Sequence, residues 1–155
     1  MNPEFLDRKE TEQVLEKLEI YGIEEIPFLL VKSGSNKIRA CTFKDREQIS
    51  RITNEVFTEL IGLYFAKIDG EEIRLSIDAL HLLKNQLKHN ILEIDDKQKE
   101  EYLSGNEPQI TEQQAQATNQ KIYYILKHNQ DILGMAKIVQ GVIKNYLPKE
   151  RRRKN

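Results

Sequence analysis

The sequence contains very few residues of the kinds that bind metals or form covalent cross-links. It has one cysteine, Cys41, and three histidines among 155 residues. A single cysteine allows no disulfide within the chain and is typical of proteins from a reducing compartment. The three histidines and the cysteine are scattered, unlike the closely spaced ligand sets of structural zinc sites. We therefore expect no disulfide, no bound metal and no other cofactor.

Long apolar segments are also missing. No apolar run reaches the roughly 18 residues that a membrane-spanning helix needs. The first ten residues, MNPEFLDRKE, carry mixed charge without an apolar core, which is not the pattern of a secretory signal. We expect a cytoplasmic protein with no membrane partner.

Signatures of catalysis are absent as well. There is no glycine-rich phosphate loop and no Gly-x-Gly nucleotide turn. Ser76, Asp78 and His81 lie close together, but a helix start capped by Ser76 or Asp78 explains them better than a catalytic triad, and places His81 on the exposed side. Cys41 has no neighbouring histidine and is expected to be buried or half-buried rather than nucleophilic. We predict that the protein is not an enzyme.

Charge is distributed unevenly along the chain. The whole sequence has a net charge of −1, yet residues 131–155 contain seven Lys or Arg and two Asp or Glu, a net of +5. Residues 1–30 contain eight acidic and three basic residues, a net of −5, and should avoid phosphates. A basic cluster at one end is typical of a nucleic-acid-binding surface. The alternative is a solvated, frayed basic tail.

Hydrophobic periodicity predicts an α/β unit in the first half of the chain. The first helix is expected to open at Asn2-Pro3 or at Asp7, since Asp7-x-x-Glu10 resembles a capping box. Gly22 is expected to end this helix, and Asp69-Gly70 to form the turn of a hairpin. The predicted helices cover residues 2–21, 44–60 and 77–87, and the predicted strands cover residues 28–32, 37–42, 63–68 and 71–76.

A break at residues 88–90 separates this unit from a mostly β second half. There the pattern predicts a helix over residues 95–103 and a surface loop over the polar, Gln-rich tract 111–120. A turn at Gln140-Gly141 is expected to join the last two strands. The predicted strands cover residues 91–94, 122–127, 132–139 and 142–146. The sequence thus predicts an α+β protein with domains at 1–88 and 89–155, the second of which forms a small barrel.

Several stretches, in this order and spacing, resemble one family, the Nip-seven-like ribosome-biogenesis factors. They are VLEKLEIYG (14–22), LYFAKI (63–68), IRLSIDAL (73–80), ILEIDDKQKEEYLSG (91–105) and DILGMA (131–136). The resemblance implies a small α/β pre-PUA domain over 1–88 and a PUA-like pseudo-barrel over 89–155. It also implies a non-catalytic factor of large-subunit ribosome biogenesis, of the archaeal type. Such a factor binds ribosomal RNA or its precursor and contacts protein partners through its N-terminal domain.

The segment GVIKNYLPKER (141–151) is similar to the RNA-binding tail of the Sun-type rRNA cytosine methyltransferases. Those enzymes carry a large cofactor-binding domain with a Pro-Cys nucleophile, for which this chain has neither the room nor the motif. Both resemblances imply a C-terminal half that binds structured RNA. The glycine-containing loop usual after the PUA helix is replaced by residues 105–108. Glu107 and Glu112 would face a phosphate there, so we place RNA contact on the last strand and the tail.

Residues on the last strand and tail form the predicted site. Lys144 and Tyr146 are two apart on one expected strand and would share a face, with Lys137 beside them if the turn is tight. Tyr146 either stacks on an unpaired base or closes the barrel as a core residue. Backbone contacts from such side chains position RNA without reading its sequence, so recognition by shape is expected. The predicted RNA-binding residues are Lys137, Lys144, Tyr146, Lys149, Arg151, Arg152 and Arg153.

The side chains after Pro148 are expected to serve the same purpose from the solvent. Lys149, Arg151 and Arg152 would project outward, where Arg gives bidentate phosphate contacts and Lys a point charge. Arg153 lies nearer the end of the chain and is expected to be mobile.

Three functions remain open on the sequence alone. The first is an RNA-binding factor of ribosome biogenesis. The second is a protein adaptor whose basic tail docks on an acidic partner, such as an RNA-processing complex. The third is an accessory subunit of an RNA-modifying enzyme. The sequence does not identify the RNA, the protein partners or the oligomeric state.

Overall fold

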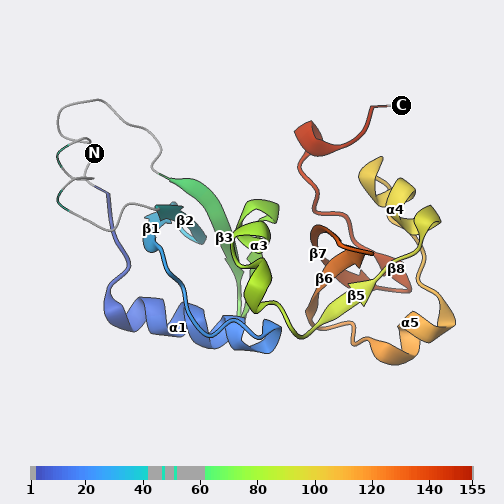
Figure 1. Ribbon diagram of the computed structural model, residues 1–155, viewed down its shortest axis with the longest axis horizontal. Coiled ribbons are helices and arrows are strands. Elements are labelled where there is room, and N and C mark those ends of the chain that lie inside the picture. Colours follow the sequence, from blue (N-terminus) through green and yellow to red (C-terminus); the bar gives the residue numbers. More distant parts are fainter. Residues whose placement is uncertain (1–2, 42–46, 48–50, 52–61, 155) are drawn as a thin grey trace. The chain divides into compact units, whose positions relative to one another are not determined.

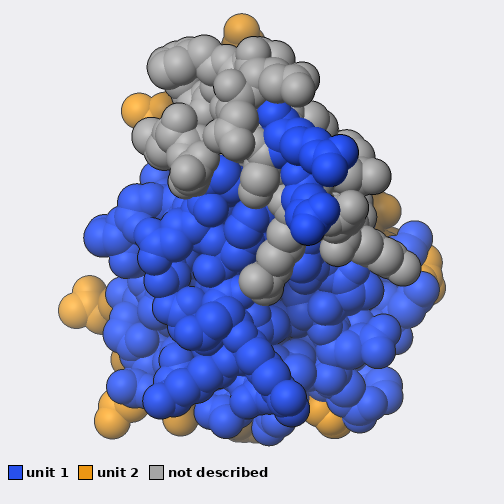
Figure 2. Space-filling view, turned by 90° about the vertical axis from the view of Figure 1, so that its left-hand side faces the viewer, with its two compact units in different colours: residues 1–88 blue, residues 89–155 orange. Residues whose placement is uncertain are grey.

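The computed structural model describes residues 3–41, 47, 51 and 62–154 (Figure 1). The chain forms two compact units, Met1–Lys88 (unit 1) and His89–Asn155 (unit 2), which are coloured separately in Figure 2. The helix expected over residues 44–60 falls almost wholly outside the described residues. None of the described helices is long and apolar enough to cross a membrane.

Unit 1 contains an antiparallel four-stranded sheet in the order β1-β2-β3-β4. Its strands are β1 (Leu29–Ser33), β2 (Lys37–Cys41), β3 (Leu63–Asp69) and β4 (Glu72–Leu75). The helices are α1 (Arg8–Leu18) and α3 (Ile77–Leu82), each continued by a 3₁₀ turn, at Glu19–Tyr21 and at Lys84–Gln86. The most deeply buried apolar side chains of the unit are Leu18, Tyr21, Ile23, Phe65, Ile73, Leu80 and Leu83.

The ends of α1 follow from local chemistry. Asp7 forms a capping box with Glu10, each side chain accepting from the other's backbone N–H at 2.8 and 2.9 Å. Of the two starts expected for this helix, Asp7 is confirmed and Asn2-Pro3 is wrong, because Phe5 forms a β-bridge with Val31 instead. Gly22 ends the 3₁₀ turn with a φ of +89°, a conformation that disfavours any residue with a Cβ.

The start of α3 is as expected from the sequence. Ser76 is the N-cap, and its hydroxyl accepts a hydrogen bond from the Ala79 N–H at 3.1 Å. The His81 side chain is exposed. The helix is shorter than predicted, since regular α-helix stops at Leu82 and the rest of the span is a 3₁₀ turn.

Unit 2 is built on a second four-stranded sheet, in the order β5-β6-β7-β8, which curls into a half-barrel. Strand β5 (Ile91–Glu93) pairs parallel to β6 (Tyr123–His128), while β7 (Asp131–Val139) pairs antiparallel to β6 and to β8 (Val142–Ile143). Helices α4 (Asp96–Leu103) and α5 (Glu112–Ala117) complete the unit. The predicted mixed fold, an α/β unit followed by a mostly β unit, is confirmed.

Helix α5 corrects the expectation of a loop over residues 111–120. Thr111 caps it and forms a capping box with Gln114. The Gln114 amide also pairs reciprocally with the amide of Gln98, at 2.8 and 3.0 Å, and donates to the Glu93 carbonyl at 2.9 Å. Polar side chains, rather than an apolar face, therefore hold this helix to the rest of unit 2.

The last strand is shorter than predicted. Residues Gln140 and Gly141, with φ of +51° and +76°, form the expected tight turn between Val139 and Val142. Strand β8 then ends at Ile143 instead of residue 146. The chain leaves the sheet because the Asn145 side chain bonds to backbone groups elsewhere in the unit.

Candidate RNA-binding surface

Two of the predicted residues meet around one buried aromatic ring. Lys137 on β7 lies directly across from Tyr123 on β6, and its Nζ is 4.6 Å from the centre of the Tyr123 ring. The Tyr146 ring packs edge-on against the same ring, with centroids 5.8 Å apart and planes at 61°. Tyr123 is 2% exposed, whereas Tyr146 is 38% exposed. We call Lys137, Tyr123 and Tyr146 the tyrosine–lysine cluster.

The cluster excludes one of the two roles considered for Tyr146. Tyr123 occupies the core position, and Tyr146 leans on it with part of its ring in solvent. The exposed part of the Tyr146 ring offers a stacking surface for a base, and the Lys137 ammonium on the shared Tyr123 ring offers a cation for a phosphate. Tyr146 is thus not a core residue that closes the barrel.

The sequence predicted that Lys144 and Tyr146 share a face of one strand, but they do not. The Lys144 backbone N–H donates to the Lys137 carbonyl at 2.9 Å, while its Nζ forms an ion pair with Glu107 Oε2 at 2.9 Å. The Lys144 and Glu107 side chains are both partly exposed to solvent, at 37% and 42%. An ion pair in this setting contributes about 0–1 kcal/mol, so a phosphate can displace Glu107.

Asn145 is a positioning residue that the sequence reasoning missed. Its Nδ2 donates to the carbonyls of Tyr102 and Asn106 at 2.7 and 2.8 Å, and its Oδ1 accepts from the Leu147 N–H at 2.9 Å. These bonds tie the segment after β8 to the C-terminal end of α4. They also fix the backbone on which Tyr146 stands. No periodicity in the sequence marks an asparagine for this role.

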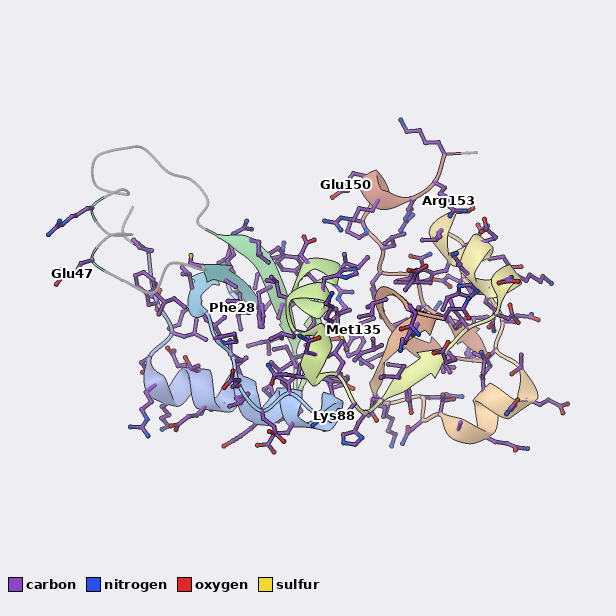
Figure 3. All side chains as sticks on the ribbon, in the orientation of Figure 1. Phe28, Glu47, Lys88, Met135, Glu150 and Arg153 are labelled. Atoms are coloured by element: carbon purple, nitrogen blue, oxygen red, sulfur yellow. The ribbon has the colours of Figure 1, made fainter. Side chains whose placement is uncertain are left out.

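The tail after Pro148 begins with a 3₁₀ turn, Lys149–Arg151. The side chains of Lys149, Glu150 and Arg151 are exposed. Figure 3 labels Glu150 on this turn and Arg153 beyond it, beside α4. Lys149 and Arg151 therefore lie at the surface, as predicted.

Arg152 does not project into solvent. Its Nε donates to the Leu147 carbonyl at 3.0 Å. Its side chain also lies against the backbone of Gly105, where an added Cβ would be 2.7 Å from Arg152 Cδ. Gly105 has a φ of +89°, so the site requires glycine on two counts.

Arg153 is held in place as well, contrary to the expected mobility. Its backbone N–H donates to the Leu103 carbonyl at 2.7 Å, and its Nη1 pairs with Glu100 Oε2 at 2.6 Å. The last carbonyls of a helix lack partners within the helix and favour nearby cations. Arg153 therefore supplies a hydrogen-bond donor, its backbone N–H, and a positive charge, its guanidinium, to the C-terminal part of α4.

Groups suited to metal binding are not assembled in the part of the chain that the structure describes. It contains no group of three or more His, Cys, Asp or Glu arranged to hold a metal ion. Cys41 is 3% exposed, and burial raises the pKa of its thiol, which disfavours the reactive thiolate.

Comparison with known families gives a match for unit 2. Residues 89–153 match the family model described as the methyltransferase RsmF PUA domain. No curated protein matches the chain. The C-terminal unit is therefore PUA-like, as both resemblances implied, and a PUA domain indicates RNA binding. The match lies within unit 2 and does not extend to the stretches of unit 1 that resemble Nip-seven-like factors.

Proposed function

We propose that the protein binds structured RNA, without catalysing a reaction, through the surface formed by Lys137, Tyr146, Lys149 and Arg151. The observation that carries this proposal is the half-exposed Tyr146 ring, which packs on the same Tyr123 ring as the Lys137 ammonium, on a unit that matches an RNA-binding domain. The ring takes an unpaired base, and the cations take the flanking phosphates. Lys144 joins them when phosphate replaces Glu107.

The biological setting we propose is ribosome biogenesis, with ribosomal RNA or its precursor as the ligand and the cytoplasm as the location. This rests on the order of stretches that resemble Nip-seven-like factors across both units. Unit 1 then contacts protein partners of the same process.

A second candidate function follows from the family that unit 2 matches. That family model describes the PUA domain of a methyltransferase. The protein would then be the RNA-recognition subunit of a modifying enzyme, whose catalytic chain is separate. Purification of a catalytic chain together with this protein, and dependence of its activity on this protein, would favour this function.

The test is an RNA titration followed by fluorescence anisotropy at two salt concentrations, with a stem-loop that carries unpaired bases and a fully paired duplex. Tyr146→Ala should weaken binding of the stem-loop by about 1–3 kcal/mol, while Tyr146→Phe retains most of the affinity. Lys149→Gln with Arg151→Gln should flatten the log–log salt slope by about 1.5 for both RNAs, because two phosphate contacts are lost.

A matched control removes two exposed lysines from elsewhere in unit 2, Lys97→Gln with Lys121→Gln. It changes the net charge equally and should leave the salt slope close to that of the unchanged protein. Equal affinities for all variants would place the RNA surface elsewhere. No binding by the unchanged protein would leave the adaptor function ahead.

A further inference from the structure

Unit 2 contains a pocket that the proposed RNA-binding surface does not use. Its volume is about 560 Å³, which is in the range of pockets that enclose small ligands, and its lining is mainly polar. Part of the lining comes from α4 and its N-cap, and the rest from the loop that joins α4 to α5. We call it the α4 pocket. Its lining includes Gln98, Glu101, Asn106, Glu107, Gln109 and Ile110.

The α4 pocket adjoins the proposed surface through one ion pair. Glu107 lines the pocket, and its Oε2 is 2.9 Å from Lys144 Nζ. The Lys144 N–H in turn donates to the carbonyl of Lys137, whose ammonium lies over the Tyr123 ring. All four residues belong to unit 2. When a phosphate replaces Glu107 at Lys144, the base of a neighbouring nucleotide is therefore within reach of the pocket.

Hydrogen bonds hold the backbone around the pocket in place. The Asn106 N–H donates to the Glu101 carbonyl at 2.9 Å, which ties the start of the loop to α4. Gln98 is 4% exposed, and its side-chain amide donates to the Gln109 carbonyl at 2.9 Å. A ligand that enters the pocket therefore has little backbone to order, which favours binding.

Three polar side chains of the pocket are left over by the fold. Among the residues that the structure describes, the side chains of Glu101, Asn106 and Gln109 have no hydrogen-bond or ion-pair partner. Glu101 is half-buried, whereas Asn106 and Gln109 are exposed. A carboxylate accepts hydrogen bonds, and the two amides both donate and accept them. The pocket thus offers acceptors and donors side by side.

The charges of the pocket suit a neutral ligand better than an ion. Asp95, Glu101 and Glu107 all line it, and their carboxylates repel a phosphate. Lys97 lines it too, and its ammonium opposes a cation. Asp95 caps α4 and Glu107 pairs with Lys144, so the Glu101 carboxylate is the one left to bind a ligand. A neutral group with N–H donors and a carbonyl acceptor fits this lining, and unpaired nucleobases present such edges.

We propose that the α4 pocket binds an unpaired guanine base of the RNA, which adds base specificity to a surface that otherwise recognises shape. This inference rests on the proposed function of unit 2. Guanine presents two adjacent donors, N1–H and N2–H, and the Glu101 carboxylate accepts from both, while the Asn106 or Gln109 amide donates to O6. Ile110 supplies an apolar contact for the ring. Adenine, cytosine and uracil lack the pair of adjacent donors.

The first experiment measures the binding of stem-loop RNAs to the full-length protein by fluorescence anisotropy. The stem is constant, and in the loop uridine alternates with guanosine, inosine or adenosine. The guanosine loop should bind about tenfold more tightly than the adenosine loop, because adenine cannot make the bidentate contact. The inosine loop should lie between them, since inosine lacks only the N2 amine. Equal affinities would overturn the inference and leave the proposed function standing, whereas no binding of any loop would overturn both.

Variants of the same protein test the role of Glu101. Glu101→Gln should remove the preference, so that the guanosine and adenosine loops bind equally. The matched control, Glu93→Gln, removes the same charge from an exposed residue outside the pocket and should keep the preference. Tyr146→Ala should weaken the binding of every loop without changing their order. A preference for guanosine that survives Glu101→Gln would count against the pocket.

A second measurement needs no substitution and is therefore independent of any effect on folding. Guanosine monophosphate is added to the ¹⁵N-labelled protein, and NMR records the side-chain amides of Asn106, Gln109 and, as a control on α5, Gln116. The first two should shift with guanosine monophosphate and much less with adenosine monophosphate, while Gln116 should not move. Equal shifts with both nucleotides, or none, would contradict the proposal. Shifts with an arginine-rich peptide alone would identify a protein-docking site and also rule it out.

Discussion

At the scale of single residues, Asn145 determines where the C-terminal segment goes. The Asn145 amide joins the segment after β8 to two carbonyls at the end of α4 and to the Leu147 N–H. Tyr146 stands immediately beyond it and packs on Tyr123. One neutral side chain thereby places an aromatic residue that we propose contacts RNA.

We predict that Asn145→Ala lowers the free energy of unfolding by about 2–3 kcal/mol, because the Asn106 carbonyl and the backbone groups of two buried residues, Tyr102 and Leu147, each lose a hydrogen bond. Asn145→Asp should be no better, since a carboxylate keeps the acceptor for Leu147 but cannot donate to the two carbonyls. Urea denaturation followed by circular dichroism measures both. Gln116→Ala, on the exposed side of α5, is the control and should change little. A loss below about 0.5 kcal/mol for Asn145→Ala would contradict this role.

Residue-scale expectations held where the chemistry is local. Ser76 caps α3, His81 is exposed and Cys41 is buried, as their immediate neighbours in the sequence indicate. Arg152 was expected to project into solvent and Arg153 to be mobile, but Arg152 bonds to Leu147, and Arg153 bonds to Leu103 and Glu100. Their partners lie up to 53 residues away along the chain, and a charge pattern says nothing about such distances.

At the scale of elements, α4 and α5 show how two polar helices are joined. Each begins with a capping box whose third residue is a glutamine, Gln98 in α4 and Gln114 in α5. The two amides then pair with each other, and Gln98 also donates to the Gln109 carbonyl at 2.9 Å. Gln98 is only 4% exposed, so water has little access to the hydrogen bonds of its side chain.

We predict that Gln114→Glu destabilises unit 2 by about 2 kcal/mol at neutral pH, although glutamate is as good as glutamine in a capping box. A carboxylate still accepts from Thr111 but cannot donate to Glu93 or to Gln98. Gln116→Glu introduces the same charge on an exposed position of the same helix and should be close to neutral. Thermal unfolding compares the two, and equal midpoints would argue against the amide pair.

The sequence contained part of this information. Thr111-x-x-Gln114 has the spacing of a capping box and could have indicated α5, yet the scarcity of apolar residues favoured a loop. The helix forms because Gln114 finds Gln98 and Glu93, on elements that precede it in the chain. The prediction of a loop from polar composition was therefore wrong. Composition indicates whether side chains favour solvent, but not whether they form hydrogen bonds within the fold.

At the scale of the whole molecule, the chain divides after residue 88 into two compact units. Each has its own sheet and its own buried side chains. The unit 2 core includes Tyr102, Ile125, Leu126, Ile138 and Ile143, all at most 1% exposed. The side chains that we propose contact RNA, and the groups that position them, are also within the unit.

We predict that residues 89–155 fold without unit 1 and unfold in a single cooperative transition, as other domains of similar size do. Calorimetry of this fragment measures it, and a fragment without a cooperative transition would contradict it. In the fragment, the effect of Tyr146→Ala on RNA affinity should persist.

The sequence by itself determined the features that depend on neighbouring residues. These include the caps at Asp7 and Ser76, the Gln140-Gly141 turn and the mixed α+β fold, because dihedral preferences and hydrophobic periodicity act over a few residues. Only the tertiary structure decided which polar and charged groups are paired. Glu107 pairs with Lys144, and Gln114 pairs with Gln98, and both contacts join segments that meet only in the folded chain.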